Sequence, residues 1–140
     1  MESSNSCERI IDANLNRSKE ALRVVEDILR FNYDDEDLAT QAKSIRAALG
    51  TIAKQHIKTI AHRDTQNDCL TQVTLNEEKK RESLFDILIA NFKRAQESLR
   101  VLEEVFKLVN VEGSLLSKQL RYKTYISVSY THLTLPIYSV

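Results

Sequence analysis

The sequence predicts an all-α protein, an internally duplicated helical hairpin that forms a four-helix bundle with pseudo-twofold symmetry. Three observations predict this fold. The 140 residues include only two glycines and one proline, which favours few turns and long elements. Apolar residues recur at the spacing of one face of a helix. A 19-residue segment also occurs twice, which indicates two equivalent structural units.

The first half of the chain, about residues 6–61, is predicted to hold two long helices. Asn5 and Glu8 resemble a capping box, and a helix at about 6–32 follows them. After a break rich in Asn and Asp, a second helix is expected at about 35–61. The apolar positions on the two helical faces are Ile11, Leu15, Ala21, Leu22, Val25, Ile28 and Leu29, then Leu38, Ala42, Ile45, Leu49, Ile52 and Ile60.

The second half of the chain begins after residues 62–78, which lose the helical period and are expected to form a loop. A third helix is predicted at about 79–110. Gly113 is expected to stop this helix, and Ser114 to cap a fourth helix that covers about residues 115–126. The third helix is expected to bury Leu84, Leu88, Leu99, Leu102, Val105 and Phe106.

The duplication relates residues 13–31, ANLNRSKEALRVVEDILRF, to residues 90–108, ANFKRAQESLRVLEEVFKL, without gaps. Eight of the 19 aligned pairs are identical. A weaker similarity relates residues 43–46 to residues 118–121. Each half is therefore predicted to be one long helix followed by a second one.

The last residues, 127–140, are predicted to lie outside the bundle. They alternate between polar and apolar types and contain the single proline, Pro136. One interpretation is a frayed, disordered terminal segment. The other is a non-native one, because YTHLTLP looks like a translated sequencing-adapter fragment. The predicted domain is therefore 1–126, with halves at about 6–61 and 79–126.

Composition excludes several functional classes. Lys and Arg number 20 and so do Asp and Glu, and this balance argues against a general binder of nucleic acid or anionic membrane. Two glycines cannot supply a P-loop or a dinucleotide-binding fingerprint. Cys7 and Cys69 form no metal-type pair, which is typical of reduced thiols. Without an apolar run of membrane-spanning length or a signal-peptide core, a cytoplasmic protein is expected.

Two polar pairs on the predicted core faces are candidates for function. Asn14 falls inside the apolar arc of the first helix, Arg17 falls on its flank, and Asn91 and Arg94 are their copies. Burying such groups costs several kcal/mol unless each finds a partner. One interpretation is a pocket near the pseudo-twofold axis where two arginines bind an anion, such as phosphate. The other is ion pairing inside the bundle with nearby carboxylates.

The duplicated segment repeats further charged residues. Glu20 and Glu97 lie one turn beyond the arginines, where a salt bridge at i,i+3 is the favoured interpretation. Four more repeated charges fall on the far side of the two helices, where a solvated face is predicted and a contact with another helix or a partner is the alternative. These four residues are Arg23, Glu26, Arg100 and Glu103.

The loop sequence HRDTQND at 62–68 collects hydrogen-bond donors, acceptors and two carboxylates. Arg63 suits the binding of phosphate, and Asp64 with Asp68 suits the binding of magnesium. From these residues alone an ordinary turn is favoured, because Asn and Asp are common turn residues. His56 lies on the apolar stripe of the second helix and is predicted to be structural.

RIIDANLNRSKEALRVVEDILRF at 9–31, RDTQND at 63–68 and IANFKRAQESLRVLEEVFKL at 89–108 together resemble one small bacterial family. The resemblance covers about 120 residues in order. The family is the alternative hydroxymethylpyrimidine-phosphate kinase of thiamine biosynthesis, which is unrelated to the ribokinase-like kinase. It occurs alone or fused ahead of thiamine-phosphate synthase.

The resemblance implies that ATP, with magnesium, phosphorylates hydroxymethylpyrimidine monophosphate to the diphosphate. The diphosphate is the pyrimidine substrate of thiamine-phosphate synthase, which is therefore an expected partner. The resemblance also implies that the free alcohol is not a substrate. A site built around arginines is consistent with this, because a substrate without phosphate leaves those arginines unpaired.

The resemblance also implies site residues. Arg17, Arg94, Arg63 and Asp64 would be catalytic, and Asp64 and Asp68 would bind magnesium. One Asn–Arg pair would hold the substrate phosphate, while the other pair and Arg63 would hold the phosphates of ATP. The residues implied to bind substrate or phosphate are Asn14, Glu20 and Arg23, with their copies Asn91, Glu97 and Arg100.

One residue departs from the family pattern. Leu70 stands where the pattern has a glycine, and it would hinder binding if that glycine lets the backbone approach a phosphate. A competing interpretation is a non-catalytic accessory or dimerisation module that docks onto the synthase or a second copy of itself. Arg23 and Arg100 would then be interface residues. Binding of ATP with magnesium separates the two classes.

Overall fold

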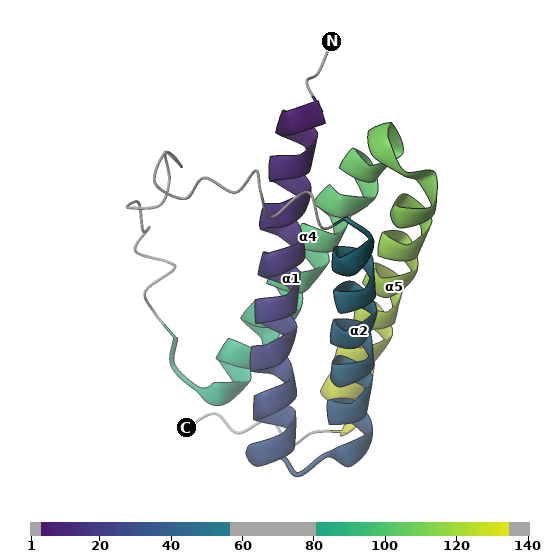
Figure 1. Ribbon diagram of the computed structural model, residues 1–140. Helices are drawn as coiled ribbons and strands as arrows, with labels where there is room; N and C mark the ends of the chain where they lie inside the picture. The colour runs from purple at the N-terminus through teal and green to yellow at the C-terminus, as the bar shows by residue number, and fades with distance from the viewer. Residues whose placement is uncertain (1–3, 57–80, 135–140) are drawn as a thin grey trace.

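The computed structural model describes residues 4–56 and 81–134. Over these residues the chain forms four helices and no strand, which confirms the predicted all-α class (Figure 1). The helices are α1 (Ser4–Phe31), α2 (Glu36–Gln55), α4 (Leu84–Val109) and α5 (Val111–Thr134).

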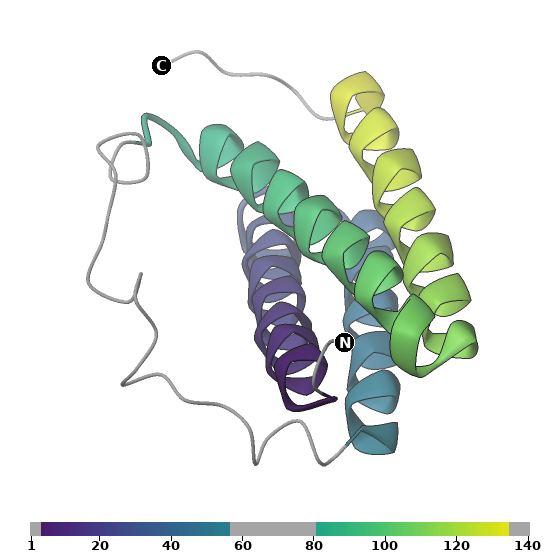
Figure 2. The ribbon, with the colours of Figure 1, turned by 90° about the horizontal axis from the view of Figure 1, so that it is seen from above.

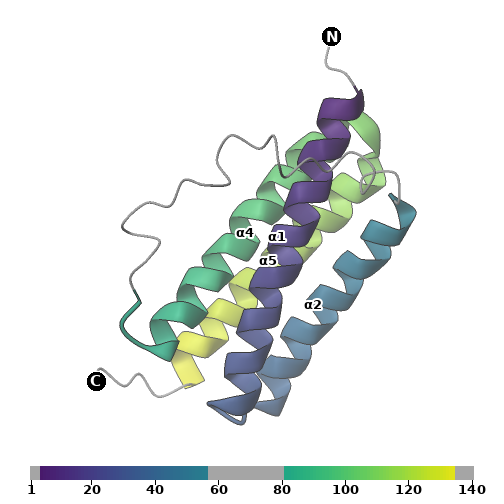
Figure 3. The ribbon, with the colours of Figure 1, turned by 60° about the vertical axis from the view of Figure 1, so that its left-hand side comes forward.

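The four helices form two hairpins, α1 with α2 and α4 with α5, and α1 and α4 pack against each other at the centre. α1 packs against both α2 and α4, while α5 packs against α4 and α2. Figure 3 shows α1 lying between α4 and α2. α1 and α4, the two copies of the duplicated segment, run in opposite directions (Figure 1). This is the arrangement expected of two hairpins related by a pseudo-twofold axis.

Side chains at the helix ends explain where α2 and α4 begin. The Asp35 carboxylate accepts a hydrogen bond from the Leu38 backbone N–H at 2.9 Å. The Ser83 hydroxyl accepts one from the Asp86 backbone N–H at 3.1 Å. Each bond satisfies one N–H that a helix start leaves without a partner. The third helix therefore begins at Leu84, later than the expected start near residue 79.

A single residue, Asn110, separates α4 from α5. Its side-chain oxygen accepts hydrogen bonds from the backbone N–H groups of Glu112, at 3.0 Å, and Gly113, at 3.3 Å. The fourth helix therefore starts at Val111, and the expected stop at Gly113 with a cap at Ser114 is wrong. An asparagine cap allows the chain to restart a helix at once, because it supplies the acceptor that these N–H groups need.

The core repeats the duplication of the sequence. Five pairs of equivalent apolar positions on α1 and α4 are buried, with at most 3% of each residue exposed. Of the apolar positions predicted for these helices, Leu84 is exposed because it is the first residue of α4, and Val105 is only partly buried. The equivalent core pairs are Ile11 and Leu88, Leu15 and Phe92, Leu22 and Leu99, Val25 and Leu102, and Leu29 and Phe106.

α2 and α5 bury residues at the same spacing but of different types. Equivalent positions on α2 and α5 are separated by the same number of residues as Arg46 and Arg121. α2 contributes mostly large apolar side chains, whereas α5 contributes mostly small and hydroxyl-bearing ones. The equivalent buried pairs are Leu38 and Gly113, Ala42 and Ser117, Ile45 and Leu120, Leu49 and Thr124, and Ile52 and Ser127.

α5 continues beyond the expected end near residue 126 and runs through Thr134. Ser127 and Thr131 are buried: the Ser127 hydroxyl donates to the Gln41 side-chain oxygen at 2.8 Å, and the Thr131 hydroxyl donates to the Ser127 carbonyl at 2.8 Å. The prediction of a disordered segment is therefore wrong for residues 127–134. Packing of small, internally bonded side chains against α2 outweighs their modest helix propensity.

The C-terminal end of α2 is held by aromatic and polar contacts. His56 caps the helix through a bond from its backbone N–H to the Ala53 carbonyl. The imidazole ring lies 5.0 Å from the Phe106 ring, and its Nε2 lies 3.2 Å from Asn110 Nδ2. His56 thus has the structural contacts that its sequence position predicts. None of the four described helices combines the length and apolar content of a membrane span.

Candidate functional site

A pocket of about 520 Å³ lies between α1 and α4. Five positions on each helix line it, and they form pairs separated by 77 residues. This is the same offset that relates residue 13 to residue 90 in the duplicated segment. The pairs are Asn14 and Asn91, Arg17 and Arg94, Glu20 and Glu97, Ala21 and Ser98, and Val24 and Val101.

The pocket gathers six of the residues selected from the sequence, namely the Asn, Arg and Glu of both copies. Reasoning from the sequence missed the two valines, together with Ala21 and Ser98. The signal for them was present, because Val24 and Val101 are an identical pair of the duplication. They also follow Arg17 and Arg94 by two turns, which places them on the same helix face.

The two asparagines are fixed in the same way. Asn14, which is only 4% exposed, donates a hydrogen bond from Nδ2 to the Ile10 carbonyl at 2.9 Å. Asn91 Nδ2 donates to the Ile87 carbonyl at 2.8 Å. Each bond uses one N–H of the amide and holds its orientation. The other N–H and the oxygen of each amide remain for a ligand, since neither bonds to another described residue.

The two arginines are exposed in the pocket, and within the described chain neither has a carboxylate within 4.0 Å. Glu20 and Glu97 likewise form no ion pair among these residues. The interpretation of the four charges as intrabundle salt bridges is therefore wrong for the described residues. Guanidinium groups that no described carboxylate neutralises are suited to binding phosphate, and the two carboxylates to binding donor groups of the same ligand.

The opposite directions of α1 and α4 give the pocket two equivalent ends (Figure 1). Asn14 and Arg17 lie toward one end, where Val101 of α4 is also placed. Asn91 and Arg94 lie toward the other end. Each end thus combines an amide and a guanidinium from one helix with an apolar side chain from the other. Such a pocket can hold two anionic groups at once, each beside an apolar part of its ligand.

Arg23 and Arg100 do not line this pocket. Arg23 Nε lies 3.7 Å from the Asp27 carboxylate, and Arg100 lies 3.3 Å from Glu104. Both arginine side chains are more than half exposed. The structure therefore does not bring together the full set of repeated residues that the resemblance implied for the site.

Glu26 and Glu103 are buried, so the prediction that they belong to a solvated face is wrong. Each is 6% exposed and pairs with an arginine on the second helix of its own hairpin. Arg46 Nη2 lies 2.9 Å from Glu26, and Arg121 Nη2 lies 2.9 Å from Glu103. These arginines are the last residues of the weaker similarity between 43–46 and 118–121. The duplication thus preserves an ion pair inside each hairpin.

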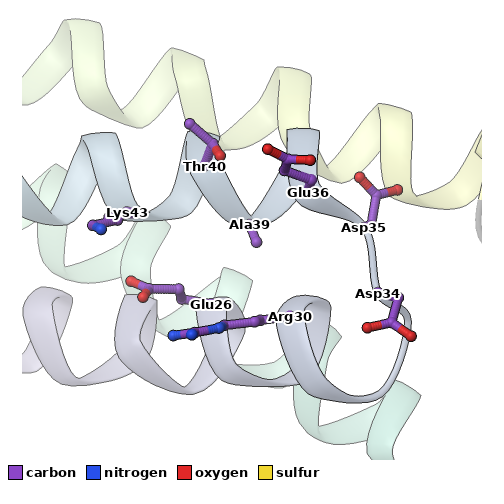
Figure 4. Close-up of a pocket in the computed structure, with 8 residues that line it drawn as sticks. All are labelled: Glu26, Arg30, Asp34, Asp35, Glu36, Ala39, Thr40 and Lys43. Atoms are coloured by element: carbon purple, nitrogen blue, oxygen red, sulfur yellow. The ribbon is translucent and has the colours of Figure 1, made fainter.

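A second pocket, of about 390 Å³, lies where α1 turns into α2. Figure 4 shows Glu26 and Arg30 of α1 facing Lys43 of α2, with Asp34 and Asp35 at the turn. Asp35 caps α2 and Glu26 pairs with Arg46, so both have structural roles. Within residues 4–56 and 81–134, no group of three His, Cys, Asp or Glu side chains is placed to hold a metal ion.

The loop residues Arg63, Asp64 and Asp68, together with Leu70, lie outside the described residues. Their assignment to phosphate and magnesium stays a prediction.

Comparison with known proteins gives a consistent family relationship. A model described as the ThiD2 family matches residues 9–129. The chain is 42% identical over 118 residues to a thiamine-phosphate synthase of Thermosynechococcus vestitus, covering 84% of this chain and 33% of that protein. It is 44% identical over 117 residues to a thiamine-phosphate synthase of Synechocystis sp., covering 84% and 34%. The chain thus spans about a third of the length of these curated relatives. No solved structure matches it.

Proposed function

This chain belongs to the ThiD2 family, and from that premise we propose that it acts as a kinase in thiamine biosynthesis. It transfers the γ-phosphoryl group of ATP to hydroxymethylpyrimidine monophosphate, and the product is the diphosphate. We place this reaction in the cytoplasm and name thiamine-phosphate synthase, which uses the diphosphate, as the partner enzyme. The relatives that carry the printed name thiamine-phosphate synthase support the choice of pathway.

One observation carries the proposal, the pocket whose five residue pairs follow the duplication. A reaction between two phosphate-bearing molecules needs two anion sites that face a common space. Arg17 and Arg94 supply such sites from opposite ends, and no carboxylate of the described residues neutralises them. A single-substrate binding module has no need for the second site.

The chemistry requires one bond to form and one to break. An oxygen of the substrate phosphate attacks the γ-phosphorus of ATP, and the bond between that phosphorus and the β,γ-bridging oxygen breaks to release ADP. Catalysis of such a transfer rests on positioning and charge stabilisation. Arg17 with Asn14 holds one phosphate, and Arg94 with Asn91 holds the other, so that the two reacting groups meet at the pseudo-twofold axis.

The carboxylates in the pocket have a complementary role. Glu20 and Glu97 accept hydrogen bonds from donor groups of the pyrimidine or of the nucleotide ribose. Magnesium, when bound, neutralises charge on the ATP phosphates, and Asp64 and Asp68 are its proposed ligands. The preference for a monophosphate follows from the arginines, because the free alcohol leaves one guanidinium without a counterion.

The proposal is tested by coupled ADP release from ATP and magnesium, with either the pyrimidine monophosphate or the pyrimidine alcohol. Turnover is expected with the monophosphate alone. Arg17→Ala and Arg94→Ala should each abolish it, whereas Arg9→Ala, on an exposed position of α1 outside the pocket, should retain it. A folded protein that turns over neither compound, or equal activity in all three variants, would contradict the assignment.

A second candidate function is a non-catalytic accessory module of thiamine-phosphate synthase. The observation that favours it is the coverage, since the matched region is only about a third of proteins that carry the synthase name. Calorimetric titration with ATP and magnesium separates the two candidates. Binding that Arg17→Ala or Arg94→Ala weakens favours the kinase, and no binding favours the module.

A further inference from the structure

Apart from the buried Leu120, α5 carries most of its large apolar residues on the outside of the bundle. Five of them form one strip along the helix, because positions i, i+4, i+11, i+14 and i+15 fall on one face. Figure 2 shows α5 at the edge of the bundle. The exposure of these five side chains indicates that this face is not covered by α2 or α4. This outer strip consists of Val111, Leu115, Tyr122, Tyr125 and Ile126, which are between 41% and 65% exposed.

The first hairpin, α1 with α2, shows whether the fold itself requires an outer apolar strip. α2 occupies the equivalent place in the same fold, and its outer face has no large apolar residue at the corresponding positions. The fold itself therefore does not require the outer strip. The residues of α2 that correspond to the strip are Glu36, Thr40, Ala47, Gly50 and Thr51.

The rotation of α5 about its axis is held by its inner face. Arg121 donates from Nε and Nη2 to the buried Glu103 carboxylate at 3.1 and 2.9 Å. The buried hydroxyl of Ser117 donates to the Gly113 carbonyl at 2.7 Å, so this inner residue has a satisfied hydrogen bond. Turning the strip inward would break the ion pair with Glu103, which explains why the apolar side faces outward.

The strip contains an ordered aromatic cluster. The Tyr122 and Tyr125 rings lie 5.9 Å apart at their centroids. Arg121 lies 5.0 Å from the Tyr122 ring centroid and donates from Nη1 to the Tyr125 hydroxyl at 3.3 Å. Because Glu103 fixes Arg121, the two rings are held in place before any partner binds. Pre-ordered Tyr and Arg side chains are typical of the residues that dominate binding energy at protein interfaces.

We propose that the outer strip is the interface with a second copy of this chain, with the two α5 helices packed antiparallel about a twofold axis. Glu112 and Lys123 are eleven residues apart, so they lie on the same edge of the strip, three turns from each other. In an antiparallel pair this edge faces the same edge of the partner helix. Glu112 of one copy then meets Lys123 of the other, twice by symmetry.

The size of the exposed surface suits such a dimer. The five side chains of the strip at about half exposure offer on the order of 500 Å² on each copy, so that a dimer would bury about 1,000 Å² in total, the lower bound for a specific interface. Lys118 lies within the strip, between Leu115 and Tyr122 along the helix, and its long side chain is exposed, so that its stem can pack on the strip while its ammonium group reaches water.

The oligomeric state of the full chain tests the proposal. Sedimentation equilibrium at micromolar to 100 µM protein should give twice the monomer mass of 16.1 kDa. The double variant Leu115→Ser, Tyr122→Ser should be monomeric with an unchanged helical circular dichroism spectrum. The matched control Thr40→Ser, Ala47→Ser, at the equivalent places on α2, should remain dimeric. A monomeric wild-type chain, with or without a different protein bound to the strip, overturns the proposal.

A charge exchange tests the antiparallel arrangement. Glu112→Lys or Lys123→Glu alone should raise the dimer dissociation constant about tenfold, because each places like charges at both contacts. The double exchange Glu112→Lys, Lys123→Glu should return it to within about twofold of wild type. Additive weakening in the double variant would rule out this pairing of the two helices. This experiment does not depend on kinase activity, so the two proposals fail or succeed separately.

Discussion

Glu103 on α4 and Arg121 on α5 form an ion pair that Glu26 on α1 and Arg46 on α2 repeat in the other hairpin. The closest contact is 2.9 Å in both pairs, and both carboxylates are 8% exposed at the side chain. Hydrogen bonds with Tyr125 and Glu103 raise the pKa of Arg121 above its ordinary value. Arg121 therefore keeps its charge, and removing the Glu103 carboxylate would leave that charge without its counterion.

Replacing Glu103 by Gln should destabilise the protein strongly. The loss of a mostly buried carboxylate leaves Arg121 without its counterion, and such losses cost about 3–5 kcal/mol when the pair is buried. Chemical denaturation monitored by circular dichroism measures the effect. Glu104→Gln is the matched control. Glu104 is next to Glu103 in the sequence, but its carboxylate is 47% exposed and contacts only exposed cations. Equal midpoints for the two variants would mean that the buried pair adds nothing beyond a surface contact.

The two pocket arginines should be dispensable for folding but not for phosphate binding. Both are exposed and have no ion pair with any described residue, so Arg17→Ala and Arg94→Ala should leave the melting temperature unchanged. Calorimetric titration with inorganic pyrophosphate should show affinity reduced about tenfold or more in each variant, since charge-assisted bonds to phosphate contribute about 1.5–3 kcal/mol. If only one variant loses affinity, the two ends of the pocket are not equivalent binding sites.

Sequence periodicity and the duplication were sufficient to predict the four helices and six of the ten residues that line the pocket. The exposed state of Arg17 and Arg94 and the burial of Glu26 and Glu103 were not predictable in the same way. Arg17 and Arg94 lie at one edge of the apolar faces. Glu26 and Glu103 were predicted to lie on the far side, but each follows a core residue, Leu22 or Leu99, by four positions and so lies about 40° from it, at the other edge. Which edge is covered depends on where the second helix of each hairpin packs, and the pattern of a single helix does not contain that information.

α5 shows a second limit of sequence patterns. Its large apolar residues predict a buried face, but the structure buries the opposite face, with Gly113, Ser117 and Thr124. Two features select this rotation, namely the ion pair of Arg121 with Glu103 and the close approach of Gly113 to Phe106. Both are contacts between helices, so hydrophobic periodicity within α5 gives the wrong answer for its packing.

The Glu104 carboxyl should titrate below the usual glutamate pKa of 4.5, because the hydrogen bond and charge of Lys107 favour its ionised form. A lowered carboxyl pKa stabilises the fold at pH values above the unfolded pKa, and this contribution is lost as pH falls through the folded value. NMR titration of the Glu104 side chain measures the shift. In Lys107→Met the pKa should rise toward 4.5, whereas an unchanged pKa in that variant would exclude Lys107 as its cause.

The two glycines of the chain should respond in opposite directions to alanine. At Gly113 an added Cβ would lie 2.9 Å from Cδ1 of the fully buried Phe106 ring. Gly113→Ala should therefore lower the free energy of unfolding by about 1–3 kcal/mol, as overpacked cores do.

At Gly50, inside α2, a Cβ would meet nothing within 4 Å. Gly50→Ala should raise the free energy of unfolding by about 0.5–1 kcal/mol, because alanine is the better helix former. Urea denaturation of the two variants measures both effects, and a Gly113→Ala variant as stable as wild type would show that α5 does not depend on this close approach.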